Sequence, residues 1–387
     1  MRLIKRPRVF EVSIPQQVLD TISAKLALAH LTYAPADSDP WRHGMSAQYL
    51  GEFLDYWRHS YDWRSAEGRL NRFPQFKVQV EDIDIHYYHL RGSGRAPRPL
   101  ILTHGWPGSI IEFIDVIERL AHPERFGGHE DDGFDVVVPS LPGYAFSSRP
   151  SAPIGPRRVA QLWRRLMVDI LGYERFFAQG GDWGAAVTCW LGSDHPDCVS
   201  AIHINLFLGP PPADAEDAQT RAWRQSLEAV QSRESGYAHL QMTRPQTIGL
   251  ALSDTPLGFA AWVLEKFQRW GDTKGDIESR FDKDTLITNI MLYLVNGAVA
   301  SSLWMYYGAN EESPRYADRV CIPVGVALFP GEFLPMAPRA AMERVLNIKR
   351  WTRMKAGGHF AALEEPAAFA DEVRAFFRET SINQPTE

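Results

Sequence analysis

The sequence predicts an α/β fold in which a mostly parallel central sheet is flanked by helices. From about residue 96 onwards, short apolar segments of strand length are separated by stretches in which apolar residues recur at helical spacing. Strands that alternate with helices are typical of βαβ units, which build parallel sheets covered on both faces. A long helical stretch, Asn205 to Ile322, interrupts this alternation. We expect it to form a cap domain over the carboxyl edge of the sheet, where such folds bind ligands.

Residues 1–95 precede the alternation and are predicted as an N-terminal extension. Their apolar spacing predicts two helices and then two strands of a hairpin, over Val18–Ala29, Tyr49–Trp57, Lys77–Val80 and Ile83–Tyr88. The turn-rich stretch Arg91–Pro99 follows and marks the expected boundary.

Buried strands are expected where apolar residues run together in the remaining chain. These segments are Leu100–Thr103, Asp135–Val138, Phe176–Gln179, Val199–Ile204, Val324–Phe329 and Ile348–Met354. They divide the chain into a first core part over residues 96–205, a helical cap over 206–320 and a second core part over 321–387.

The composition excludes several classes of function. The net charge is −6, from 41 basic and 47 acidic residues, and no basic run of the kind a nucleic-acid binder needs is present. The cysteines Cys189, Cys198 and Cys321 are too few and too scattered for a disulfide framework or a zinc site. We therefore expect no metal and a reducing, cytoplasmic location. The N-terminus is basic but lacks the apolar stretch of a signal peptide or membrane anchor.

One segment is long enough to test for a membrane span. Between Thr285 and Asn310 the sequence has no charged residue. The segment contains Asn289, Asn296 and Ser301, however, whose polar side chains a lipid environment would penalise. A buried helix near a ligand site is therefore favoured over a membrane span.

The strongest single motif is Gly180-Gly181-Asp182-Trp183-Gly184, which follows a predicted strand and leads into a helical pattern. A strand–turn–helix with the frame G-x-nucleophile-x-G is the nucleophile elbow of α/β-hydrolases. Gly180 and Gly184 flank the turn because side chains there would collide in so tight a bend. Asp182 stands where the usual serine would be. The alternative is a plain turn in which Asp182 caps the next helix.

An aspartate in the nucleophile position changes the chemistry. A carboxylate is already ionised at neutral pH and needs no base before it attacks. Its natural target is an sp³ carbon that bears a leaving group, and the product is an alkyl ester. Asp182 therefore points toward strained epoxides or alkyl halides, and away from peptides and ordinary esters.

The second motif, His104 to Ser109, follows the strand predicted at Leu100–Thr103. In α/β-hydrolases this loop supplies an N–H group to the oxyanion hole. Pro107 cannot donate, so Trp106 N–H is the expected donor, paired with Trp183 N–H. His104 is favoured as a structural residue, hydrogen-bonded within the loop, over a catalytic base.

The third motif is Gly357-Gly358-His359-Phe360, which follows the last predicted strand. The hydrolase chain order places the catalytic histidine last, so His359 is the candidate base, and its alternative is a surface-loop histidine. Glu332 directly follows the strand Val324–Phe329 and is the candidate acid that orients His359. A solvated loop carboxylate is its alternative, and the competing acids, in poorer strand context, are Glu311, Glu312 and Asp318.

Long, ordered motifs run through nearly the whole chain. They are Phe10–Val12, Tyr61–Arg64, Leu70–Phe76, His104–Ser109, Pro139–Ser147, Gly180–Gly184, Glu234–Tyr237, Pro245–Leu252 and Leu264–Phe267. In these motifs the sequence resembles the microsomal-type epoxide hydrolases, a family that includes the juvenile hormone epoxide hydrolases and related soluble fungal and bacterial enzymes. Microsomal members carry an apolar N-terminal anchor that this sequence lacks, so we expect no membrane attachment.

The resemblance implies a role for each matching residue. Asp182 is the nucleophile, His359 the base and Glu332 its partner, in agreement with the roles that the motifs alone predict. The resemblance adds two cap tyrosines that hold the epoxide oxygen, Tyr237 and Tyr306, with Tyr307 as the alternative to the second. From the residues alone, each tyrosine would be interpreted as core packing. The implied reaction converts an epoxide and water into a vicinal diol, without a cofactor.

The substrate is expected to be a small-molecule epoxide. The cap is rich in aromatic residues, and Phe207, Trp304 and Tyr307 are candidates for a pocket that suits a bulky or aromatic epoxide from xenobiotic or natural-product metabolism. Two other functions remain as alternatives: a haloalkane or haloacid dehalogenase, in which Trp183 would help bind halide, and a catalytically silent hydrolase-fold binding protein. An apolar cap and an arm-like extension are compatible with a homodimer.

Overall fold

The computed structural model describes residues 6–37, 39–209, 217–312 and 319–382. The described residues form one nine-stranded sheet in the order β1-β2-β3-β5-β4-β6-β7-β8-β9. Its strands are β1 (Arg8–Phe10), β2 (Gln75–Val80), β3 (Ile83–Leu90), β4 (Arg98–Thr103), β5 (Phe134–Pro139), β6 (Phe176–Gly180), β7 (Val199–Ile204), β8 (Val320–Leu328) and β9 (Leu346–Arg353). Every predicted strand is confirmed, with ends that shift by a few residues.

The sheet is parallel from β5 to β9 and antiparallel from β1 to β5. The predicted hairpin is present, with Val80 opposite Ile83. The sequence places this hairpin in a separate extension, but β3 hydrogen-bonds to β5 and makes the hairpin part of the central sheet. The physical reason lies in β3, where residues 85–88 are all buried, so that both faces of the strand need cover.

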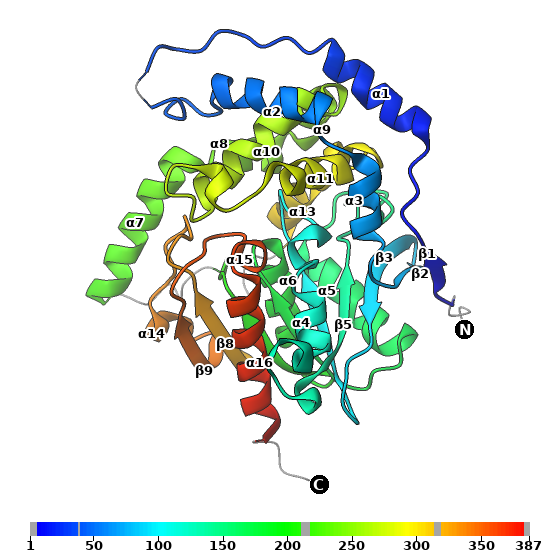
Figure 1. The fold of residues 1–387 in the computed structure, drawn as a ribbon. Coiled ribbons are helices and arrows are strands. Elements are labelled where there is room, and N and C mark those ends of the chain that lie inside the picture. The colour runs from blue at the N-terminus through cyan, green and yellow to red at the C-terminus, as the bar shows by residue number, and fades with distance from the viewer. Residues whose placement is uncertain (1–5, 38, 210–216, 313–318, 383–387) are drawn as a thin grey trace.

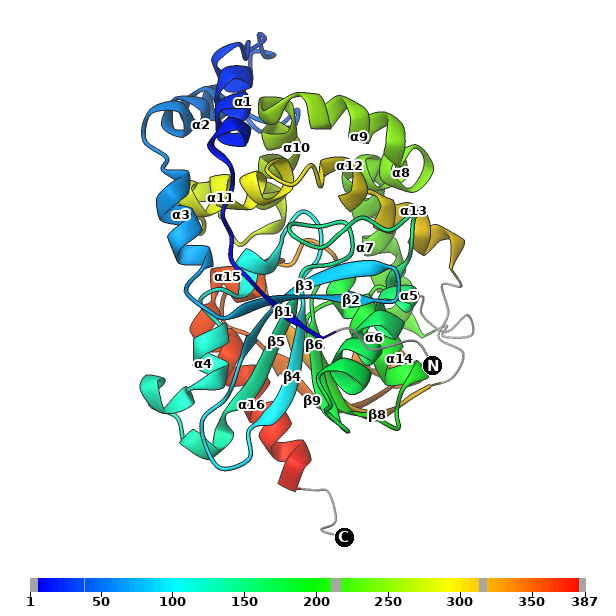
Figure 2. The same cartoon turned by 90° about the vertical axis from the view of Figure 1, so that its right-hand side faces the viewer.

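Helices cover both faces of the sheet (Figures 1 and 2). The longer flanking helices are α5 (Pro156–Arg164), α6 (Trp183–Asp194) and α16 (Pro366–Ile382), and α16 packs against the short helix α4 (Ile117–Ala121). Shorter elements in the connections are η1 (Ile110–Phe113), η2 (Pro123–Phe126), η3 (Glu130–Asp132), the π-helix η4 (Arg165–Ile170), η5 (Ile277–Ser279), α14 (Arg339–Met342) and α15 (Ala361–Glu364).

The insertion between β7 and β8 is helical, as predicted, and lies over one edge of the sheet (Figure 1). Its helices are α7 (Ala218–Glu234), α8 (Gly236–Thr243), α9 (Pro245–Asp254), α10 (Pro256–Trp270), α11 (Lys283–Leu294), α12 (Val299–Ser302) and α13 (Trp304–Glu311). The uncharged stretch that raised the membrane question begins in α11, where residues 285–293 are buried inside the protein. Among the described helices, none alone is long and apolar enough to cross a membrane. Two pairs of consecutive helices, each pair sharply bent at its junction, would be long and apolar enough together.

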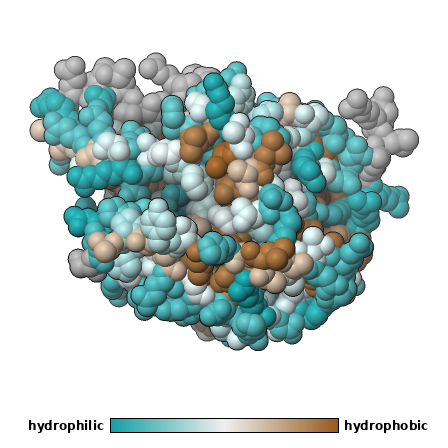
Figure 3. Space-filling view, turned by 90° about the horizontal axis from the view of Figure 1, so that it is seen from above, coloured by the Kyte–Doolittle hydropathy of each residue, from teal (hydrophilic) through white to brown (hydrophobic). Residues whose placement is uncertain are grey.

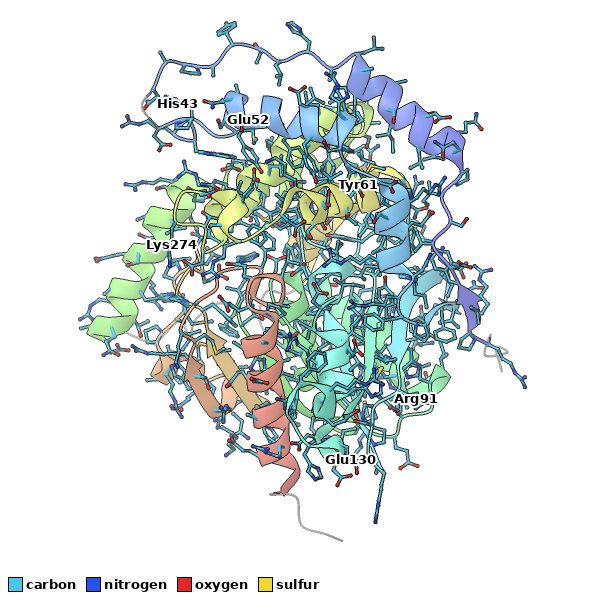
Figure 4. All side chains as sticks on the ribbon, in the orientation of Figure 1. His43, Glu52, Tyr61, Arg91, Glu130 and Lys274 are labelled. Carbon is cyan, nitrogen blue, oxygen red and sulfur yellow. The ribbon has the colours of Figure 1, made fainter. Side chains whose placement is uncertain are left out.

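The N-terminal helices α1 (Gln16–Ala27), α2 (Ala47–His59) and α3 (Trp63–Leu70) lie across the outer side of the cap (Figure 1). Polar contacts attach them to it: Lys25 Nζ lies 2.8 Å from an oxygen of the Asp254 carboxylate, and the hydroxyl groups of Tyr61 and Thr288 are 3.0 Å apart. Figure 4 shows Tyr61 where α3 meets α11. These contacts join the N-terminal helices to the cap.

Candidate active site

The predicted site residues meet at the carboxyl edge of the parallel strands. Strands β4 and β6 pair in register up to Thr103 opposite Gly180, so the loop after β4 lies beside the turn that carries Asp182. Glu332 follows β8 and His359 follows β9, and a backbone bridge between Gly331 and Gly358 joins their two loops. Four segments that are distant in sequence thus converge under the cap.

The turn at Asp182 has the geometry of a nucleophile elbow. Asp182 has φ 49° and ψ −130°, a left-handed conformation that is rare for a residue with a side chain. A Cβ on Gly180 would lie 2.1 Å from Gly184 O, and one on Gly184 would lie 1.9 Å from Thr103 O. The two glycines are therefore required, as predicted. The Asp182 side chain makes no capping hydrogen bond to α6, which removes the alternative of a plain helix cap.

Asp182, His359 and Glu332 form a contiguous triad. His359 Nδ1 lies 3.1 and 3.0 Å from the two Glu332 carboxylate oxygens, and His359 Nε2 lies 3.3 Å from Asp182 Oδ2. All three side chains are largely enclosed, with relative exposures of 16% for Asp182, 2% for His359 and 7% for Glu332. This geometry gives Glu332 the position expected of the orienting acid.

The competing acids are placed elsewhere or not described. Glu312 accepts hydrogen bonds from the backbone N–H groups of Arg157 and Arg158, at 2.8 and 3.1 Å. Glu311 is exposed to solvent, and Asp318 lies outside the described residues. Neither Glu311 nor Glu312 has a contact with His359 that would let it replace Glu332.

The electrostatics of the triad favour a charged His359 in the resting site. Burial by itself would lower the pKa of His359, but the neighbouring Glu332 and Asp182 carboxylates outweigh it and hold the pKa well above 6.5. Part of that effect comes from Asp182, whose charge would disappear on esterification. Loss of that charge would lower the pKa of His359, so its neutral form, which can take a proton from water, would be better populated.

The loop after β4 supplies a hydrogen bond to the candidate nucleophile. Trp106 N–H donates to Asp182 Oδ1 at 2.8 Å, the position expected of an oxyanion-hole donor. The second expected donor, Trp183 N–H, stays a prediction. His104 is buried and has the structural role that was favoured, because Nδ1 lies 3.0 Å from Gly105 O and Leu141 N–H donates to Nε2 at 3.2 Å. Burial also lowers the pKa of His104 to about 4.

The cap places two tyrosines over the triad. Tyr237 on α8 stacks on Trp106 with ring centroids 5.3 Å apart, and Tyr306 on α13 packs edge-on against Trp183 at 4.8 Å. The two tyrosine rings are 5.8 Å apart, and their side chains are hydrogen-bonded. Burial and the Asp182 charge raise the pKa of Tyr237 above its usual value, so the phenol stays protonated and able to donate at neutral pH.

The structure resolves the choice between the neighbouring tyrosines on α13. Tyr306 is 4% exposed and contacts the site, whereas Tyr307 is 37% exposed. Successive residues on a helix point about 100° apart, so both cannot face the triad. Tyr307 as a residue of the substrate pocket stays a prediction. Trp304 and Phe207 are half-buried, and their place in a pocket stays a prediction.

Sequence reasoning assigned no role to three further residues near the site. Trp270, at the end of α10, lies with its ring 5.0 Å from that of His359. Lys266 Nζ lies 4.8 Å from the centre of the Tyr237 ring, and Glu112 lines a cavity beside Asp182. The sequence contains one feature that could have pointed to Glu112, because it is the single acidic residue within the apolar run Ile110–Ile114. No cluster of His, Cys, Asp or Glu suited to a metal ion occurs within the described residues.

Comparisons with known proteins agree with this geometry. The family model described as "Epoxide hydrolase N terminus" matches residues 7–113, and the model described as "alpha/beta hydrolase fold" matches residues 98–241. Epoxide hydrolase 1 of Oryctolagus cuniculus is 33% identical over 405 residues, which cover 95% of this chain and 88% of that protein.

Two solved structures are similar over nearly their whole length. Juvenile hormone epoxide hydrolase of the silkworm Bombyx mori superposes with a TM-score of 0.85 at 27% identity, covering 98% of this chain and 95% of that one. The epoxide hydrolase of Aspergillus niger gives a TM-score of 0.84 at 30% identity, covering 97% and 96%. With its elbow aspartate, its histidine and glutamate partners and its paired cap tyrosines, the chain belongs to the epoxide hydrolase family of the α/β-hydrolase fold.

Proposed function

We propose that this protein hydrolyses small-molecule epoxides to vicinal diols in two steps, through a covalent ester on Asp182. The observation that carries the proposal is the arrangement around one carboxylate. Oδ1 of Asp182 accepts a hydrogen bond from Trp106 N–H, Oδ2 lies beside His359, and two protonated phenols lie above the site in the cap. A nucleophile, a base and two acids are thus gathered at one point.

In the first step the Asp182 carboxylate attacks one epoxide carbon. A bond forms between a carboxylate oxygen and that carbon, the strained C–O bond breaks, and its electron pair moves to the departing oxygen. Tyr237 and Tyr306 donate hydrogen bonds to this oxygen as it becomes an alkoxide, and one phenol supplies the proton. The buried phenols need no change of protonation state before the reaction.

In the second step water cleaves the ester. His359, oriented by Glu332, takes a proton from water, and the hydroxide attacks the carboxyl carbon of Asp182. Negative charge develops on Oδ1, where Trp106 N–H already donates. One such donor is worth about 3 kcal/mol to the transition state. The tetrahedral intermediate then collapses to the Asp182 carboxylic acid and releases the diol, whose alkoxide oxygen takes the proton from His359. The Asp182 carboxylic acid gives its proton, directly or through solvent, to the tyrosinate left by the first step, which regenerates both the carboxylate and the phenol.

The test is a variant that can alkylate but cannot hydrolyse. His359→Gln should accumulate the ester, visible as an increase in intact protein mass equal to the mass of the epoxide, while Asp182→Ala should show no such adduct. A His359→Gln protein that turns over at the wild-type rate and carries no adduct would contradict the two-step scheme.

We also propose that the substrate is bulky or aromatic and that the protein forms a homodimer in the cytoplasm. The first point is supported by four aromatic side chains that pack against one another beside the triad, Trp106, Trp270, Tyr237 and Tyr306. Apolar residues gather near the centre of the upper face, which supports the second (Figure 3). A panel of terminal aryl, aliphatic and disubstituted epoxides tests the substrate, and sedimentation analysis tests the dimer.

A further inference from the structure

The loop that carries His359 is fastened to the cap. Residues 270–280, the cap segment, run from the end of α10 toward α11 and lie against this loop. Lys274, within the cap segment, lies where the cap meets the core (Figure 4). His359 N–H donates to Trp270 O at 3.0 Å, so the catalytic base and the cap share a backbone hydrogen bond.

Asp272 makes the most contacts between the cap segment and this loop. Its Oδ2 accepts a hydrogen bond from Gly357 N–H at 3.2 Å, two residues before His359, and another from Arg280 Nη2 at 2.8 Å. The Arg280 side chain also donates to Asp272 O at 3.1 Å and to Glu365 Oε1 at 2.7 Å. The Asp272 side chain is 15% exposed and that of Arg280 is 19% exposed, so solvent screens these charge-assisted hydrogen bonds only weakly.

Glu364 fastens the other side of the loop. Its Oε1 accepts a hydrogen bond from the N–H group of Phe360, the residue after His359, at 3.0 Å. Its Oε2 accepts one from Asp272 N–H at 2.8 Å. One buried carboxyl group therefore joins the cap segment to the backbone that follows the base.

Two glycines show how closely the cap segment lies against both catalytic loops. A Cβ on Gly358 would lie 2.7 Å from Asp272 N, and one on Gly331 would lie 2.6 Å from Asp272 Cβ. Gly358 directly precedes His359, and Gly331 directly precedes Glu332. The cap segment thus packs against the loop of the base and against the loop of its orienting acid, with no room for a side chain between them.

We propose that the cap aligns the catalytic base, and that Asp272, supported by Arg280, is a positioning residue for His359. The inference rests on the proposed function. His359 Nδ1 lies 3.0 Å from one Glu332 oxygen while Nε2 lies 3.3 Å from Asp182 Oδ2, and this double contact requires a fixed backbone around the imidazole. The ester is therefore hydrolysed while the cap is seated on the core, because lifting the cap segment removes the hydrogen bonds on either side of the base.

Single-turnover kinetics with styrene oxide and excess enzyme separate the two steps, with the ester followed by intact mass. Asp272→Ala keeps the Cβ that packs on Gly331 and removes the carboxylate. We expect ester formation within about threefold of wild type, because Asp182, its donor Trp106 and the cap tyrosines lie outside the cap segment. Ester decay should slow at least about tenfold, since misplacing a catalytic group by about 1 Å costs up to about a hundredfold. Asp272→Asn retains an oxygen acceptor and should restore decay to within about threefold of wild type.

The pH dependence of ester decay reports the alignment of His359. In the ester the charge of Asp182 is absent, and the Glu332 carboxylate is the neighbour that raises the pKa of His359. In Asp272→Ala the imidazole is free to move away from Glu332, so this pKa falls and the half-maximal point of ester decay moves to lower pH, by about 0.5 unit or more. A general loss of stability would leave that point unchanged.

Asp194→Ala is the matched control. The Asp194 side chain is 15% exposed, like that of Asp272, and it too is paired with an arginine, since Arg157 Nε donates to Asp194 Oδ2 at 2.7 Å. It lies at the opposite end of α6 from Asp182, so its loss should leave the ratio of the two rates and the pH profile unchanged. Arg280→Met is the second variant if Asp272→Ala does not fold, and it too should slow ester decay selectively.

The outcomes separate the inference from the proposed function. Wild-type protein that never forms the ester would overturn the proposed function itself. A wild type that forms the ester, with decay within about threefold of its rate in both Asp272→Ala and Arg280→Met, would overturn the inference alone. Equal slowing of both steps with an unshifted pH profile and a lowered melting temperature would also overturn it, because Asp272 would then only stabilise the fold.

Discussion

Replacement of Gly105 by alanine should disable the site without unfolding the protein. A Cβ at position 105 would lie 2.1 Å from Asp182 Oδ1, 2.4 Å from Asp182 Cβ and 2.6 Å from Asp182 Cγ. Ordinary van der Waals contact begins at 3.4 Å, so the carboxylate oxygen must retreat by about 1.3 Å, the difference between the two distances. All three atoms belong to the Asp182 side chain, and because its Cβ is fixed to the backbone, the chain at position 105 or 182 must also shift locally.

The expected loss follows from that displacement. A retreat of about 1.3 Å takes Oδ1 out of reach of Trp106 N–H, which is 2.8 Å away in the structure. Displacement of the nucleophile by about 1 Å costs on the order of a hundredfold in ester formation. Loss of one oxyanion donor costs about 3 kcal/mol, a further hundredfold, in ester hydrolysis.

The assay is single-turnover formation and decay of the ester with styrene oxide, together with thermal melting. Gly68→Ala is the matched control, because Gly68 is exposed on α3 and a Cβ there has no neighbour within 4 Å. It should leave both rates unchanged and raise stability by about 0.5–1 kcal/mol. Ester formation in Gly105→Ala within about threefold of wild type would refute the reasoning.

Two further predictions concern the cap and the buried acid. Tyr306→Phe should slow ester formation on the order of a hundredfold through loss of an acid that faces the epoxide, and leave ester decay intact. The control Tyr307→Phe should be silent, and an unaffected Tyr306→Phe enzyme would remove the phenol from the mechanism. Glu112 predicts a pH effect, since its folded-state pKa of about 8 exceeds the usual 4.5. A raised carboxyl pKa gives stability that is fully present below about pH 4.5 and is lost as the pH rises toward 8, by at most about 1.4 kcal/mol per pH unit. Melting temperatures from pH 5 to 8 should fall less steeply in Glu112→Gln than in wild type, and parallel curves would contradict the assignment.

The parts of the structure that local chemistry dictates could be predicted from the sequence. The strands of a parallel sheet are apolar throughout, so Val199–Ile204 was predicted with its observed ends. The elbow was equally clear, because Gly180 and Gly184 are required by contacts within the turn itself. The order of catalytic residues along α/β-hydrolase chains then predicted Glu332 after the strand β8 and His359 after the strand β9.

The rest depends on tertiary packing, which a pattern does not encode. Whether Tyr306 or Tyr307 faces the triad depends on how α13 is rotated against the core. The hairpin looked like part of a separate extension because its pairing with β5 joins segments far apart in the chain. The place of Glu112 was missed for the same reason, since only the fold shows that its carboxyl group lines a cavity beside Asp182.

The central claim is that Asp182 becomes covalently bonded to the substrate and that water then attacks the protein rather than the epoxide. The most direct measurement is a single turnover with excess enzyme in ¹⁸O-enriched water, followed by mass analysis of the diol and of the peptide that contains Asp182. We predict that the heavy isotope enters the Asp182 carboxyl group and that the diol from this first turnover is unlabelled. A labelled diol together with an unlabelled peptide would mean direct attack of water on the epoxide, and would contradict the account.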